Sequence, residues 1–320
     1  MKKLTCILLS LLVLLGLAAG ASAAEKKSIG IIQLVDNGAF TDMREGFLAR
    51  MAELGYTDET VAFDYKNAQG DMTNLYSICQ TLVDNEVDLI VTIATPPTQA
   101  IVNMESGIPV FFISVSNPVG AGVITDMATP DKLATGTSNA IPIDAMFELS
   151  AELTPDAKSF GILYNMSEIN AATTAQEAKD YMDANGYTYR EALVTASSEV
   201  QQATQTLIES GVQAIFVPND SMVQSALPLV AELANEAKIP VYGSSAVMVA
   251  SGAFATISIS DPEIGAMTAD MVDQYLNGTP IEEIPAVRVS TFTTVINQTT
   301  ADAIGITLSP EVLESAIILD

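Results

Sequence analysis

The side chains that could hold a small molecule gather in short polar segments, most of them placed directly after an apolar run of the sequence. They are mainly Ser, Thr and Asn, whose hydroxyl and amide groups donate and accept hydrogen bonds without a charge. Six such segments follow apolar runs, and a seventh lies in the polar stretch Leu133–Asp144 between the two halves of the chain. The candidates for ligand contact are Asp36, Asn37, Gly38, Phe40, Thr95, Pro96, Ser114, Ser116, Asn117, Thr137, Ser138, Asn165, Ser167, Glu168, Asn170, Asn219, Asp220, Ser244 and Ser245.

The chemistry expected from this set is reversible binding of a small polar solute. Several segments open predicted helices, whose first N–H groups are free to hold an anion such as a carboxylate. Taken singly, each Ser, Thr or Asn could instead be an ordinary helix N-cap. Asp220 is the first candidate to pair with a ligand ammonium group, with Glu168 and Asp36 as weaker alternatives. Phe40 could supply an apolar or stacking wall, and a core role for it stays equally open.

The composition and motifs exclude several classes of catalytic site. The chain contains no His, which removes Ser–His and Cys–His catalysis and every His metal site. Cys79 lies in an apolar helical stretch, which is typical of a core residue. The sequence has no P-loop, no G-x-S-x-G elbow and no metal-ligand spacing, and Gly120–Ile124 lacks the dinucleotide-binding spacing. We therefore predict no enzyme, no catalytic residue, no metal site and no cofactor.

Two copies of one strand–helix plan must position the polar segments. Short apolar runs typical of buried parallel strands alternate with amphipathic helices. The last helix of the second copy is predicted over Ser221–Ala237. Gly30 and Gly161, and likewise Pro109 and Pro240, are 131 residues apart. The repeat predicts an α/β fold of two Rossmann-like lobes, with parallel sheets joined by a multi-strand hinge. The alternative is one larger doubly wound sheet.

The crossings between the lobes set the expected boundaries. The first lobe is predicted over residues 25–137 plus about 259–285, and the second over 138–258 plus about 286–320. Thr137–Ala140 is the expected hinge segment, because its small and polar residues suit a crossover. Since ligands bind beyond the carboxyl ends of parallel strands, the polar segments of both lobes should meet in one cleft.

The N-terminus is typical of a secretory signal peptide. Lys2 and Lys3 precede the apolar run Ile7–Ala19, and Ala21-Ser22-Ala23 fits a cleavage pattern, so residues 1–24 are the expected signal. An uncleaved N-terminal anchor is the alternative. The net charge of -26 becomes near -28 without the two lysines. We therefore expect a secreted, periplasmic or otherwise extracytoplasmic monomer that repels nucleic acid.

Four ordered motifs resemble the ABC transporter substrate-binding proteins of the tryptophan-receptor-like family, which have the type I periplasmic-binding fold. The motifs are NPVGAG at 117–122, TGTS at 135–138, GILYN at 161–165 with Ser167-Glu168, and AKIPV at 237–241. Together they span nearly all of the predicted mature chain. The sequence departs from the family around Asp36–Phe40 and at Ser244-Ser245, which leaves the identity of the solute open.

The resemblance implies a binding protein of an ABC importer. Its two lobes would close on a small solute, most naturally an amino acid with an aromatic or branched side chain. The protein would then dock to an ABC permease that works with a cytoplasmic ATPase. A ligand-sensing partner of a membrane signalling receptor is the alternative function.

Overall fold

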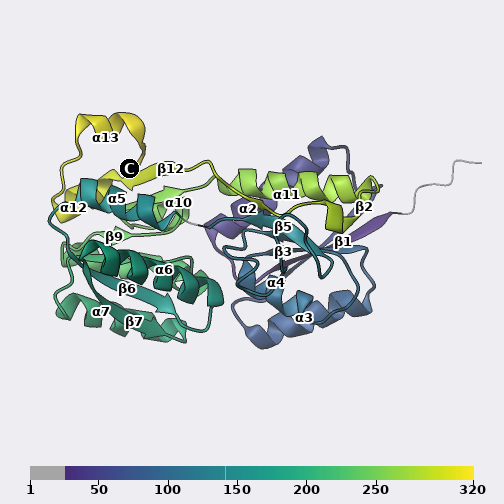
Figure 1. Cartoon of the computed structure of the whole chain (residues 1–320), viewed down its shortest axis with the longest axis horizontal. Helices are drawn as coiled ribbons and strands as arrows, with labels where there is room; N and C mark the ends of the chain where they lie inside the picture. The colour runs from purple at the N-terminus through teal and green to yellow at the C-terminus, as the bar shows by residue number, and fades with distance from the viewer. Residues whose placement is uncertain (1–25, 141) are drawn as a thin grey trace, which may run out of the picture.

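The computed structural model describes residues 26–140 and 142–320, and shows two α/β lobes side by side (Figure 1). Each lobe has a sheet of its own, with helices on both faces. This confirms the predicted two-lobe α/β fold and excludes the single larger sheet. The predicted signal peptide at 1–24 lies outside the described residues. Within the described residues, no helix has the length and apolar character needed to cross a membrane.

The first sheet has six strands, paired in parallel throughout. In spatial order they are β11 (Val287–Arg288), β5 (Ala134–Ser138), β4 (Val110–Ile113), β3 (Leu89–Ile93), β1 (Lys27–Gln33) and β2 (Val61–Asn67). One face is covered by α2 (Gly38–Glu53) and α11 (Asp261–Leu276), and the other by α3 (Met72–Asp84) and α4 (Thr95–Val102). The central strands β3 and β4 are buried throughout, as their continuous apolar runs require.

Helix α11 comes from late in the chain yet belongs to the first lobe, beside α2 (Figure 1). Two glycines allow the two helix backbones to touch. A Cβ atom on Gly265 would lie 2.0 Å from the carbonyl oxygen of Met43, and one on Gly46 would lie 2.2 Å from that of Pro262. This contact brings the first residue of α11, Asp261, close to the start of α2.

The second sheet has seven strands. In spatial order they are β13 (Ile317–Leu319), β12 (Thr293–Asn297), β10 (Ala255–Ser258), β9 (Val241–Tyr242), β8 (Ala214–Phe216), β6 (Ser159–Asn165) and β7 (Thr188–Val194). Its helices are α5 (Ile143–Leu153), α6 (Ile169–Asn185), α7 (Val200–Glu209), α8 (Ser221–Ser225), α9 (Leu227–Glu236), α10 (Ala246–Ala250), α12 (Gln298–Ile304) and α13 (Pro310–Ser315).

Two details of the second lobe differ from the sequence prediction. Strands β10 and β12 pair antiparallel, so this sheet is not parallel throughout. The helix predicted over Ser221–Ala237 is two helices, α8 and α9, with the break at Ala226. Pro228 lies in the first turn of α9, where a residue without an N–H group starts a helix but does not continue one.

The chain crosses between the lobes three times: after β5, between β10 and α11, and between β11 and β12. The last predicted boundary, about residue 286, is too early. Val287 and Arg288 pair with Thr137 and Ser138 of β5, and the N–H group of Val289 donates to the Ser138 carbonyl, so this stretch extends the first sheet. Strand β11 has only two residues, both exposed, which is why no alternating pattern revealed it.

Candidate functional site

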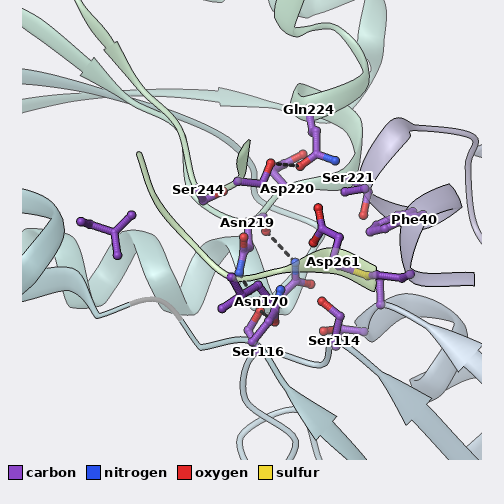
Figure 2. A pocket seen from close by; sticks show the side chains of 18 of the residues that line it. Phe40, Ser114, Ser116, Asn170, Asn219, Asp220, Ser221, Gln224, Ser244 and Asp261 are labelled. Atoms are coloured by element: carbon purple, nitrogen blue, oxygen red, sulfur yellow. Dashed lines mark hydrogen bonds between the residues drawn. The ribbon is translucent and has the colours of Figure 1, made fainter. Parts of the chain in front are cut away.

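A pocket lies between the lobes, beyond the carboxyl ends of the strands, where the sequence placed it. The space between its lining atoms is about 600 Å³, counting the part open to solvent. Figure 2 shows polar side chains of both lobes pointing into it. Of the predicted ligand residues, those that line this pocket are Phe40, Thr95, Ser114, Ser116, Asn170, Asn219, Asp220, Ser244 and Ser245.

Other predicted residues support the pocket from behind. Asn37 accepts from the N–H group of Phe40 and so caps α2, and Asn117 accepts from Gly120 within its own turn. Thr137 exchanges a hydrogen bond with Thr268 of α11, and Ser138 donates to the Ser116 carbonyl. Asp36 and Gly38 do not line the pocket either; the hydroxyl of Tyr65 donates to Asp36, and Gly38 packs against Val247.

The remaining predicted residues, Pro96, Asn165, Ser167 and Glu168, line a second, larger groove between the lobes, which we call the outer groove. The space between its lining atoms, counted in the same way, is about 1620 Å³, and Ser221 lines both it and the pocket. Glu168, which is 8% exposed, accepts from the N–H group of Ser221. Its burial, and to a lesser degree the nearby Asp220, raises the pKa of Glu168 to about 7. The carboxyl group of Glu168 therefore belongs to the wall between the pocket and this groove.

Both carboxylate oxygens of Asp220 accept hydrogen bonds from the backbone of the second lobe. One oxygen accepts from the N–H group of Val223 and caps α8, and the other accepts from the N–H group of Asn165 at the end of β6. Burial nevertheless raises its pKa. The carboxylate that the sequence offered as a partner for a ligand ammonium group thus joins a helix start to a strand end.

Asp261 is a pocket residue that sequence reasoning missed. It is 6% exposed and lines the pocket at the start of α11, and no hydrogen bond or ion pair holds its carboxylate among residues 26–140 and 142–320. Burial, together with the charge of Asp42, raises the pKa of Asp261 to about 7. Ser260 caps the helix, so an acid next to it looks like an ordinary first-turn residue that favours the helix dipole. The segment from about residue 259 is predicted to lie in the first lobe, but no pattern in the sequence indicates that α11 packs on α2 with Asp261 turned toward the cleft.

Two amide groups in the pocket wall each have one atom without a protein partner in the described part of the chain. Asn170 donates from Nδ2 to the Asn219 carbonyl at 2.7 Å, which leaves its Oδ1 as a free acceptor. Gln224 accepts at Oε1 from the Ser245 hydroxyl at 3.0 Å, which leaves its Nε2 as a free donor. Buried polar atoms without partners are costly, so such atoms in a pocket wall are expected to meet a ligand.

The first lobe contributes hydroxyl groups to the pocket. Thr95 and Ser114 line the pocket at the ends of β3 and β4, and no described side chain caps the start of α4. Ala94 and Ser114 have φ angles of 75° and 66°, which residues other than Gly rarely adopt outside strained functional segments. This arrangement favours an anionic group held by the hydroxyls, because Pro96 and Pro97 in the first turn of α4 have no N–H group to donate.

An apolar wall completes the pocket. It is formed by Phe40 and Met43 of α2, by Ile257 and Ile259 near the crossing into α11, and by Phe292 before β12. The wall gives the pocket one apolar side, whereas the carboxylate of Asp261 and the amides give it a polar one. Of this wall, the sequence analysis identified only Phe40, because the other four lie outside the segments that follow strands of the repeated plan.

The two lobes also touch directly. Asn219 of the second lobe donates from Nδ2 to the Ser116 hydroxyl of the first lobe at 3.1 Å, and Ser116 donates to Asn139 in the crossover. Figure 2 shows Ser116, Asn219 and Asn170 grouped at one end of the pocket. The lobes are therefore close enough to share hydrogen bonds across the cleft.

Comparison with known proteins gives the same assignment. A family model described as ABC transporter substrate binding protein matches residues 28–318. A tyrosine-binding protein of Clostridioides difficile is 34% identical over 281 residues, covering 88% of this chain and 81% of the relative. A crystal structure of an ABC domain from Streptococcus pneumonia in complex with L-Trp has a TM-score of 0.89 and 32% identity, covering 92% of this chain and all of that one.

A third relative differs in conformation. The ligand-free, open structure of a substrate binding protein with adhesive properties from Clostridium difficile also has 32% identity over 92% of this chain and 99% of its own, but its TM-score is 0.71. More distant solved structures, at 17% identity or less, share the two-lobe fold of type I periplasmic binding proteins. With nearly the whole described chain matched, this protein belongs to the ABC transporter substrate binding protein family.

Proposed function

We propose that the protein binds an α-amino acid with an aromatic side chain between its lobes and delivers it to an ABC importer. The observation that carries the proposal is the Asp261 carboxylate, buried in the pocket wall without a partner among the described residues. A buried carboxylate is stabilised by a cation with which it shares hydrogen bonds. The ammonium group of an amino acid supplies that cation, so Asp261 takes the role that the sequence gave to Asp220.

The rest of an amino acid fits the remaining groups. The hydroxyls of Thr95 and Ser114 suit the α-carboxylate, and the free Oδ1 of Asn170 suits a second ammonium hydrogen. The apolar wall of Phe40, Met43 and Phe292 suits an aromatic ring. Two relatives point to the same class, because one is named for binding tyrosine and another was crystallised with L-Trp.

Closure of the two lobes is the mechanism we infer. The chain superposes better on the L-Trp complex, with a TM-score of 0.89, than on the open ligand-free relative, with 0.71, at the same 32% identity. The hydrogen bond between Asn219 and Ser116 supports the same closed arrangement. A ligand that contacts both lobes stabilises the closed form relative to the open one. The flexing segments are then the three crossings, of which Thr137–Ala140 is one.

The cellular role follows from the family. Its members bind small solutes and work with an ABC permease, and we propose that this protein does so as a secreted monomer, with a cytoplasmic ATPase driving the permease. The family is a class of binding proteins, and we propose that this chain performs no catalysis.

Isothermal titration of the purified, ligand-stripped protein tests the binding function. L-Tyrosine, L-phenylalanine and L-tryptophan are titrated beside D-ribose and 3-(4-hydroxyphenyl)propanoate, which keeps the ring and carboxylate of tyrosine but lacks its ammonium group. Binding should also stabilise the fold. At about 100 times its Kd, an aromatic amino acid should add about 2.7 kcal/mol to the free energy of unfolding, which urea unfolding measures. Binding of the ribose, or of the propanoate as tightly as tyrosine, would contradict the proposal.

A further inference from the structure

The second-lobe end of the pocket carries a hydrogen-bond donor that the amino-acid headgroup does not use. Figure 2 shows Gln224 and Ser114 at opposite ends of the pocket, with Asp261 between them. If the α-carboxylate lies at Ser114 and the ammonium at Asp261, the ligand side chain extends toward Gln224. Gln224 is 9% exposed, and its Nε2 has no partner among the described residues.

The orientation of the Gln224 amide follows from its neighbour. The Ser245 hydroxyl oxygen accepts from the N–H group of Met248 and caps α10, so the hydroxyl hydrogen is left to be donated to an acceptor. That acceptor is Oε1 of Gln224, at 3.0 Å. The amide is thereby fixed with Nε2, a donor and never an acceptor, on its other side.

We infer that Gln224 selects, among aromatic amino acids, a side chain that ends in a hydrogen-bond acceptor, which makes the protein a tyrosine receptor. This inference rests on the proposed function. The phenol oxygen of tyrosine accepts a hydrogen bond from Nε2, and its own hydrogen finds acceptors in the hydroxyls of Ser221 and Ser244, which Figure 2 shows at the same end.

The side chains of phenylalanine and tryptophan both fail to accept a hydrogen bond from Nε2 of Gln224, for different reasons. The ring of phenylalanine has no acceptor and leaves the buried Nε2 donor unpaired. The indole N–H of tryptophan is only a donor, so two donors would face each other. Sites built to hydrogen-bond a substrate hydroxyl discriminate strongly against analogues that lack it, because their own polar groups are left unpaired.

The test compares Kd values of the wild-type protein for L-tyrosine, L-phenylalanine and L-tryptophan by isothermal titration. We expect tyrosine to bind about tenfold more tightly than either competitor, or better. Phenylalanine or tryptophan binding as tightly as tyrosine overturns the inference and leaves the proposed function intact. Failure of all three to bind contradicts the proposed function, and the inference with it.

A variant then assigns the effect to the residue. Gln224→Met keeps the length of the side chain and removes the donor, so it should bring the tyrosine and phenylalanine Kd values to within about threefold by weakening tyrosine alone. Gln202→Met, on the exposed face of α7, is the matched control and should keep the wild-type ratio. An unchanged ratio in Gln224→Met overturns the inference, as does an equal loss for both ligands, which indicates a structural role.

Discussion

The two sides of the interlobe pocket carry buried acids that differ in what holds them. On the second-lobe side, Asp220 accepts from two backbone N–H groups and Glu168 from one, so both carboxyls belong to the wall. At the crossing into the first lobe, Asp261 is buried to a similar degree but has no hydrogen-bond partner among the described residues. Burial alone therefore does not separate a structural acid from a binding one, whereas the hydrogen bonds do.

This difference in hydrogen bonding also determines how each carboxylate affects the stability of the ligand-free protein. A buried carboxylate without a donor destabilises the native state at any pH at which it is charged. Asp261 is such a group, and a cationic ligand relieves the cost by pairing with it. The two backbone hydrogen bonds of Asp220 compensate for its burial, so Asp220 stabilises the fold whether or not a ligand is bound.

Replacement of Asp261 should have the largest effect on binding. Asp261→Asn removes the charge that pairs with the ammonium group, and we expect the Kd for L-tyrosine to rise about 30-fold or more, from a loss of about 2–5 kcal/mol. Isothermal titration measures it. Asp42→Asn is the control, because Asp42 is exposed and acts on Asp261 only through its charge; its Kd should stay close to that of the wild type.

The same variant should make the empty protein more stable. Asp261 has a pKa of 3.8 in the reference state and about 7 in the fold, so the native state binds the proton more tightly than the unfolded state. Its presence lowers stability progressively as pH rises from about 4 to 7. Urea unfolding at pH 8 should show Asp261→Asn to be more stable by about 1–4 kcal/mol. Lower stability than wild type would place Asp261 among the structural acids.

Replacement of Asp220 should give the opposite pattern. In Asp220→Asn, the side-chain oxygen still caps α8, but the amide nitrogen turns a donor toward the N–H group of Asn165, and we expect a loss of about 1–3 kcal/mol in the free energy of unfolding. The Kd for L-tyrosine should change less than in Asp261→Asn. A stable variant that no longer binds would instead make Asp220 the ammonium partner.

Ligand affinity should fall in weakly acidic solution. The pKa of Asp261 lies near 7 in the empty protein and drops when an ammonium group pairs with it, so below pH 7 binding must first displace a proton. From pH 8 to pH 6 the Kd should rise by about tenfold. Glu168 also titrates near pH 7, so the comparison is made with Asp261→Asn: if the variant keeps the full pH dependence, Glu168 is its source.

The smallest effect is expected at the carboxylate end. Ser114→Ala removes one neutral hydroxyl from the ligand, which corresponds to a loss of about 0.5–1.5 kcal/mol and a rise in Kd of about 2- to 13-fold. Ser167→Ala is the matched control, since Ser167 was predicted as a ligand residue but lines the outer groove. Equal losses in the two variants would argue that the solute occupies the outer groove.

The sequence was sufficient to predict the site residues that belong to a local, repeated pattern. Thr95, Ser114 and Asn219 follow strands of a repeated plan, and the rule that ligands lie at strand ends places them together. Asp261, Ile259 and Phe292 lie at crossings between the lobes, where no periodicity guides the prediction. Their positions depend on tertiary contacts, such as the glycine-mediated approach of α11 to α2, which a single sequence does not display.

The most direct test is a crystal structure of the protein with L-tyrosine bound. Our account predicts the ammonium nitrogen within about 3 Å of an Asp261 carboxylate oxygen, while Asp220 keeps its bonds to the backbone of Asn165 and Val223. An ammonium group against Asp220 or Glu168 instead, or tyrosine bound in the outer groove, would contradict it.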